Sequence, residues 1–131
     1  MFSQNSENES SHSKADLLKH SLLVVITAWF KEEFFKWTDG SITRYNDPLK
    51  LLDTRLGRCG EWANCFGAIL RALDFHVREC HNVFEDHVWV EVQSLGRWIH
   101  VDPCENSIDK ERLEICLILR PSMFLRELGS P

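Results

Sequence analysis

The stretch from Gly57 to Phe66, GRCGEWANCF, constrains the fold more than any other part of this chain. Apolar residues recur at spacings of one, three and four from Trp62 onward, which predicts an amphipathic helix that runs to about Leu73. Cys59 lies where this helix is expected to begin, and the peptide dipoles at a helix N-terminus favour a thiolate and lower a thiol pKa. Cys59 is therefore either a nucleophile or a small buried cysteine beside a helix start.

The overall composition limits the class of protein. A chain of 131 residues with 44% hydrophobic residues suits one small domain, and a net charge of −5 argues against a nucleic-acid surface. The longest strongly apolar run, Leu22 to Phe30, is too short to span a bilayer. Five cysteines without a Cys-x-x-Cys pair argue against a disulfide framework and a cysteine-rich zinc site. We expect a cytoplasmic domain with no metal and no other evident cofactor.

Hydrophobic periodicity predicts the order of the elements. Residues 1–13 are polar and expected to be disordered, whereas 14–37 read as one long helix that ends at Asp39-Gly40. An apolar stripe runs along that helix, formed by Leu18, Leu22, Val25, Trp29 and Phe30. Pro48 opens a short helical turn. After the cysteine helix the period becomes two, which predicts strands at 77–82, 87–93 and 97–102.

The hairpin formed by the last two strands brings two polar residues together. A tight turn centred between Ser94 and Leu95 would place His87 directly opposite Asp102, with Cβ atoms about 4.5–5.5 Å apart. A three-residue loop or a bulge would shift the register by one and leave the two residues neighbours or diagonal. A carboxylate there can accept a hydrogen bond from Nδ1–H of the histidine and leave Nε2 to transfer protons. With Cys59 this predicts a Cys-His-Asp triad, in the order typical of papain-like and transglutaminase-like enzymes. The alternative is that both residues are surface groups at strand ends.

Three segments closely resemble the cytoplasmic peptide:N-glycanases of the transglutaminase-like superfamily. They are GRCGEWAN at 57–64, DHVW at 86–89 and RWIHVDPCE at 97–105, and the segments 29–37 and 44–52 are similar too. The resemblance covers about residues 15–112. It implies an α+β fold of the transglutaminase-like or papain-like kind, in which the catalytic-cysteine helix packs on a short antiparallel sheet after a long N-terminal helix.

The same resemblance implies an activity. The family hydrolyses the amide between an N-glycan and asparagine in misfolded glycoproteins and converts the asparagine to aspartate. Cys59, His87 and Asp102 match its catalytic triad, Glu105 matches a residue that contacts the chitobiose core, and Trp98 lies in the same sugar-side region. Trp89 belongs to a group of tryptophans suited first to the core and second to a sugar platform. Implied partners are N-glycosylated misfolded proteins and proteasome-linked ubiquitin shuttle factors.

Two departures from the family pattern limit what the resemblance implies. The family carries two Cys-x-x-Cys zinc pairs between the segments matching Trp37 and Arg44, and here only residues 38–43 lie between them. Residues 115–131 do not resemble the family either. We expect a shortened form, with a disordered tail at 1–13, a core at 14–112 without the zinc lobe, and a divergent tail at 113–131. Two alternatives stay open: an inactive binding or regulatory variant, and another thiol enzyme, a protease or transglutaminase, on the same fold.

Overall fold

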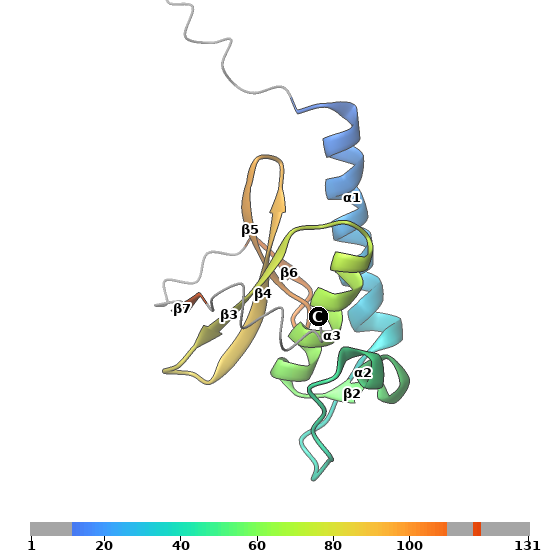
Figure 1. Cartoon of the computed structure of the whole chain (residues 1–131), viewed down its shortest axis with the longest axis vertical. Coiled ribbons are helices and arrows are strands. Elements are labelled where there is room, and N and C mark those ends of the chain that lie inside the picture. Colours follow the sequence, from blue (N-terminus) through green and yellow to red (C-terminus); the bar gives the residue numbers. More distant parts are fainter. Residues whose placement is uncertain (1–11, 110–116, 119–131) are drawn as a thin grey trace, which may run out of the picture.

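The structure, a computed structural model, describes residues 12–109 and 117–118 (Figure 1). Its main sheet has five strands in the order β6-β5-β4-β3-β7, all antiparallel. The strands are β3 (Val77–Asn82), β4 (His87–Ser94), β5 (Arg97–Asp102), β6 (Ser107–Ile108) and β7 (Leu117–Ile118). The helices are α1 (Lys14–Trp29), α2 (Pro48–Thr54) and α3 (Cys59–Ala72), and a separate two-stranded sheet joins β1 (Lys36–Trp37) to β2 (Leu56–Gly57). The predicted α+β architecture is confirmed.

Helix α3 packs against one face of the sheet, where it contacts β3 and β4 (Figure 1). Side chains alternate between the two faces of a strand, so every second residue of β4 and β5 can point toward the helix. The buried sheet residues Val90, Val92, Ile99 and Val101 belong to one hydrophobic cluster with the helix residues Phe66 and Leu70. This cluster fixes the helix on the sheet and thereby positions its N-terminus.

The first helix is shorter than the predicted segment 14–37. Its start is as expected, because Ser13 caps it in a reciprocal capping box with Asp16. The helix ends at Trp29 and continues as one π turn, η2 (Phe30–Phe34), in which the Phe35 amide donates to the Phe30 carbonyl at 2.9 Å. The wider π turn brings both rings into the core, where they stack with centroids 5.2 Å apart. Phe35 then leads into β1, which pairs with β2, and the prediction of helix to residue 37 is wrong.

Most of the predicted apolar stripe of the first helix does not pack on the core. Leu18 and Val25 are both 64% exposed, and Leu22 and Trp29 are also exposed, whereas Phe30, the last member of the stripe, is buried as predicted. From α1 itself the core receives Leu23 and Thr27. In Figure 1, α1 runs along the side of the sheet and extends beyond it.

The hairpin between β4 and β5 turns one residue later than predicted. Ser94 pairs with Arg97 and Val90 with Val101, so the two turn residues are Leu95 and Gly96. Both have positive φ, 54° and 78°, as the favoured two-residue hairpin turns require. This register does not place His87 directly opposite Asp102, and that prediction is wrong.

The predicted tails at 1–13 and 113–131 lie almost entirely outside the described residues, so their boundaries stay predictions. Within the part of the chain that the structure describes, no helix has both the length and the apolarity needed to cross a membrane.

Candidate functional site

Cys59 is the first residue of α3, as the sequence predicts, and its side chain is half-buried. The chain enters the helix from β2 through Gly57, whose close approach to the Glu61 side chain leaves no room for a Cβ atom. The Cys59 Sγ atom lies 3.8 Å from the backbone oxygen of Asp86, the residue before β4. The N-terminus of α3 therefore reaches the end of the sheet at which β4 begins.

His87 and Asp102 form a hydrogen-bonded pair beside this thiol. The Nε2 atom of His87 lies 2.6 Å from Oδ2 of Asp102, and the carboxylate is 0% exposed. We expected the Asp102 carboxylate to accept a hydrogen bond from Nδ1 of His87. That prediction is wrong, because with the two residues placed diagonally it is Nε2 of His87 that lies beside the carboxylate. Nδ1 is therefore the ring nitrogen left to exchange a proton with Cys59.

The electrostatics of the three residues favour an ion pair. Burial alone would raise the pKa of the Cys59 thiol, but hydrogen bonds with the His87 side chain and nearby backbone outweigh it, so the pKa lies below the ordinary 9.0. Hydrogen bonds to Asp102 and then to Cys59 raise the pKa of His87 to about 10. Burial opposes ionisation of Asp102 as well, yet hydrogen bonds from His87 and Cys104 hold its pKa below 3.8. A thiolate beside an imidazolium is the reactive form of a cysteine nucleophile.

Two further residues hold this pair in place, and sequence reasoning missed both roles. Cys104 donates its S–H to Oδ1 of Asp102 at 3.0 Å, so both carboxylate oxygens have partners. The Trp89 ring stacks on the His87 ring, with centroids 5.7 Å apart, and contacts His100 on β5. The contact between Trp89 and His87 could have been predicted from the sequence, because the two residues are two positions apart and therefore lie on the same face of β4.

The predicted sugar-side residues lie in different environments. The Trp89 side chain is buried and its ring packs against the rings of His87 and His100, so its faces are not accessible to a ligand. Trp98 is partly exposed, with the Arg78 guanidinium 4.1 Å from its ring centre, and Glu105 is exposed just after β5. Trp98 and Glu105 thus remain the accessible candidates for carbohydrate contact.

An ion pair between the buried Glu61 and the half-exposed Arg44, which the sequence did not reveal, stabilises the start of α3. Glu61 is 4% exposed and both of its carboxylate oxygens accept from the Arg44 guanidinium, one of them at 2.7 Å. Burial would raise the Glu61 pKa, but the Arg44 hydrogen bonds keep it below 4.5. A buried glutamate in a largely apolar helix indicates that a cation lies beside its carboxylate. Which cation this is depends on the path of the loop before α2.

His87, Asp102 and Cys104 form a group of possible metal ligands among the described residues, and their donor atoms lie within 4.8 Å of one another. Burial and the hydrogen bond to Asp102 raise the pKa of Cys104, so its thiol keeps the proton that it donates to Asp102. Residues 38–47, between β1 and α2, contain no cysteine, so the zinc lobe that the family resemblance implies has no ligands there.

Known proteins resemble this chain in both sequence and structure. Residues 9–103 match the family described as the transglutaminase-like superfamily. A Caenorhabditis elegans protein named peptide-N(4)-(N-acetyl-beta-glucosaminyl)asparagine amidase is 55% identical over 78 residues, which cover 58% of this chain and 13% of that protein. A Gallus gallus protein of the same name is 36% identical over 137 residues, which cover 70% of this chain and 21% of that protein.

A solved chain from Cytophaga hutchinsonii, named as a candidate cysteine protease, has a TM-score of 0.56 at 21% identity. The match covers 70% of this chain and 37% of the solved chain, and it shows a shared fold. The chain spans about a fifth or less of the length of the two amidases described above. Because the family match extends over most of the sequence and carries Cys59, His87 and Asp102, the chain belongs to the transglutaminase-like superfamily.

Proposed function

We propose that this chain carries the active centre of a peptide:N-glycanase, an amidase that releases N-glycans from asparagine by a thiol mechanism. The observation that carries the proposal is the assembly of Cys59, His87 and Asp102 at the start of α3, in a chain whose relatives bear that amidase name. The substrate would be an N-glycosylated polypeptide, and the products a glycosylamine and a polypeptide with aspartate in place of asparagine.

In the first half of the reaction, the Cys59 thiolate attacks the carbonyl carbon of the glycosylated asparagine side chain. The tetrahedral intermediate carries a negative oxygen, which accepts a hydrogen bond from the backbone N–H of Cys59 at the start of α3. The C–N bond then breaks, His87 gives its proton to the departing nitrogen, and the glycosylamine leaves a thioester on Cys59.

In the second half, His87 is neutral and acts as a base. It removes a proton from a water molecule that attacks the thioester carbonyl carbon. The C–S bond breaks, and the products are a carboxyl group on the polypeptide and a free Cys59. Asp102 keeps the imidazole oriented throughout and stabilises its protonated form.

The wider setting of this activity is part of the same proposal. We expect the substrates to be misfolded N-glycosylated proteins in the cytoplasm, with proteasome-linked ubiquitin shuttle factors as partners. The core, residues 14–112, would act without the family's zinc lobe. The alignment to the Gallus gallus relative runs over 137 positions but covers 70% of this 131-residue chain, so that relative contains residues without a counterpart here.

The test uses the purified chain and a denatured N-glycoprotein. Glycan release and the conversion of asparagine to aspartate are followed together by mass spectrometry. Both should occur with the unaltered chain and disappear in Cys59→Ala. A matched control is Cys65→Ala, which removes a buried cysteine from the same helix and should retain release.

The same experiment separates the other functions. The structural neighbour named as a candidate cysteine protease makes peptide-bond hydrolysis the second candidate, so cleavage of an unglycosylated peptide is measured alongside. Amine transfer to a glutamine peptide tests a transglutaminase. A chain that melts cooperatively yet performs none of the three reactions would contradict the enzyme proposal and favour a binding or regulatory variant.

A further inference from the structure

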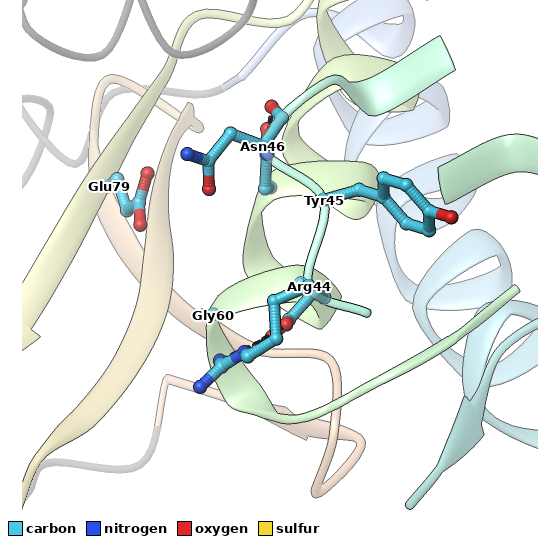
Figure 2. Close-up of a pocket in the computed structure, with 7 residues that line it drawn as sticks. Arg44, Tyr45, Asn46, Gly60 and Glu79 are labelled. Carbon is cyan, nitrogen blue, oxygen red and sulfur yellow. Dashed lines mark hydrogen bonds and ion pairs between the residues drawn. The ribbon is translucent and has the colours of Figure 1, made fainter. Parts of the chain in front are cut away.

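A cavity of about 350 Å³ opens beside Gly60, the residue that follows Cys59. It is lined by the segment Arg44–Asn46, by the first turns of α3 and by Glu79 of β3 (Figure 2). Its volume falls at the lower end of the range for small-ligand pockets, which is about 300–1,000 Å³. The cavity can therefore accept a short segment of a larger substrate whose reacting group is at Cys59.

Asn64 contributes a buried acceptor without a donor to this cavity. Its side chain is 8% exposed, and its Nδ2 group donates to the backbone oxygen of Asn46 at 2.8 Å. The other end of the amide, Oδ1, is buried and has no hydrogen-bond partner among the described residues. Buried polar atoms are nearly always paired, so such an atom marks a place where a bound molecule can donate a hydrogen bond.

The remaining polar groups make the cavity favour hydrogen-bond donors over anions. The Arg44 guanidinium is engaged by the Glu61 carboxylate, so these two charges offset each other. Figure 2 shows the Asn46 side chain and the Glu79 carboxyl group pointing toward each other across the opening, whereas the Tyr45 ring points away. The Asn64 Oδ1 atom and the Glu79 carboxylate are hydrogen-bond acceptors at this cavity, and N–H and O–H groups are their complementary ligands.

The two faces of the sheet decide which part of the substrate the cavity would receive. Glu79 pairs with Val90, which packs in the core with α3, whereas Trp98 and Asp102 of β5 lie on the other face of the sheet. The accessible sugar-side candidate Trp98 therefore lies on the opposite face of the sheet from the cavity. An amide that joins a glycan to a polypeptide must place its two halves on either side of the nucleophile.

We propose that the cavity beside Gly60 is a subsite for the polypeptide that flanks the glycosylated asparagine, with Asn64 Oδ1 accepting from a backbone N–H or a side-chain hydroxyl. The assignment of the two sides rests on the proposed amidase function. The subsite would favour substrates with an extended, accessible polypeptide over a glycosylated asparagine alone.

The test compares three chloroacetamide reagents that carry the same reactive group. One is 2-chloroacetamide itself, one carries the group on a side chain in the middle of an unglycosylated hexapeptide, and one carries it on di-N-acetylchitobiose. In each case the Cys59 thiolate displaces chloride and forms a thioether, and mass spectrometry gives the rate at Cys59. Rates are divided by the rate of the same reagent with free cysteine.

The proposal predicts faster labelling by the hexapeptide reagent than by 2-chloroacetamide. Asn64→Leu should lower the hexapeptide rate about tenfold, the worth of one buried hydrogen bond, and leave the other two rates unchanged. Glu79→Gln, which keeps the shape of the side chain, should lower it about threefold, and it carries the test if Asn64→Leu does not melt cooperatively. Glu33→Gln, the same change at an exposed carboxylate of η2, is the matched control and should change nothing.

Three results would overturn the subsite. An equal loss with all three reagents would mean that Asn64 acts on the nucleophile, a loss with chitobiose alone would assign the cavity to sugar, and no loss would leave it without a ligand role. This experiment measures labelling of Cys59 and not glycan release. A chain without amidase activity can therefore still show the polypeptide subsite, and the two failures give different results.

Discussion

Asp102 reaches His87 diagonally across the ladder between β4 and β5. The register that pairs Val90 with Val101 places Asp102 level with Trp89, two residues beyond His87 on the same face. The carboxylate nevertheless lies 2.6 Å from Nε2 of the histidine. Diagonal neighbours on one face are about 7–8 Å apart at the backbone, a gap that an aspartate and a histidine can close with their side chains. Four predictions follow from this arrangement and from the helix beside it.

Cys104 should control the position of Asp102. In Cys104→Ala the Oδ1 atom of a fully buried carboxylate loses its donor, which should lower the free energy of unfolding by about 1–3 kcal/mol and raise the pKa of Asp102. Cys104→Ser supplies an O–H donor at the same place and should reverse most of both changes. Urea denaturation and an NMR titration of the Asp102 carboxyl group measure them, and identical behaviour of the two variants would contradict a positioning role.

The reactivity of Cys59 toward iodoacetamide should persist at lower pH than that of an ordinary thiol. Its pKa lies below 9.0 because hydrogen bonds from His87 and the backbone outweigh burial, so His87→Ala should move the midpoint of the rate profile upward. Cys65, on the same helix, provides an internal control, since burial raises its pKa to about 12. The rates at both cysteines can be read by mass spectrometry in one sample. Similar pH profiles at Cys59 and Cys65 would exclude a stabilised thiolate.

In the unaltered chain the pKa shifts of Cys59 and His87 act on stability in opposite directions. The lowered pKa of Cys59 makes the folded chain lose a proton at lower pH than the unfolded chain, whereas the raised pKa of His87 makes it keep a proton to higher pH, so the two contributions to the pH dependence oppose each other.

Cys59→Ala should expose the contribution of His87 alone. Asp102 still raises the pKa of His87 above the ordinary 6.5, so the folded variant binds more protons than the unfolded variant once the pH exceeds 6.5. Its stability is greatest below that pH and should decline above it, by up to about 1.4 kcal/mol per pH unit, until the histidine is neutral in the folded state. Urea denaturation across this range measures the slope, and a stability of the variant that stays constant above pH 6.5 would contradict the prediction.

Gly57 and Gly60 should respond oppositely to alanine. A Cβ at Gly57 would lie 2.4 Å from Cβ of Glu61, so Gly57→Ala must displace the helix start and should cost about 1–3 kcal/mol of stability. At Gly60 the nearest atom to a new Cβ is Nη2 of Arg44 at 3.7 Å, an ordinary contact. Gly60→Ala should therefore keep the stability of the chain, because alanine is the better helix former. Thermal melting of both variants provides the comparison, and an equal loss in both would exclude the clash as the cause.

The sequence by itself determined the local elements. The 3.6-residue period after Cys59 defines α3, the period of two defines β3 to β5, and Gly96 specifies a tight turn with positive φ, which the structure confirms. Ser13 and Pro48 mark the starts of α1 and α2 for equally local reasons, a capping side chain and a fixed φ. These features depend on residues within a few positions of one another.

Tertiary structure decided what local patterns cannot. The π turn after Trp29 brings Phe30 and Phe35 into the same core, and α1 contributes Leu23 and Thr27 to that core rather than Leu18 and Val25. A two-position difference in hairpin register moved His87 from opposite Asp102 to diagonal and changed which ring nitrogen the carboxylate meets. The Cys104 donor, the Arg44–Glu61 pair and the unpartnered oxygen of Asn64 likewise depend on how distant segments approach each other. Sequence periodicity specifies the face of an element, whereas packing against other segments fixes the rotation and register that give each side chain its partner.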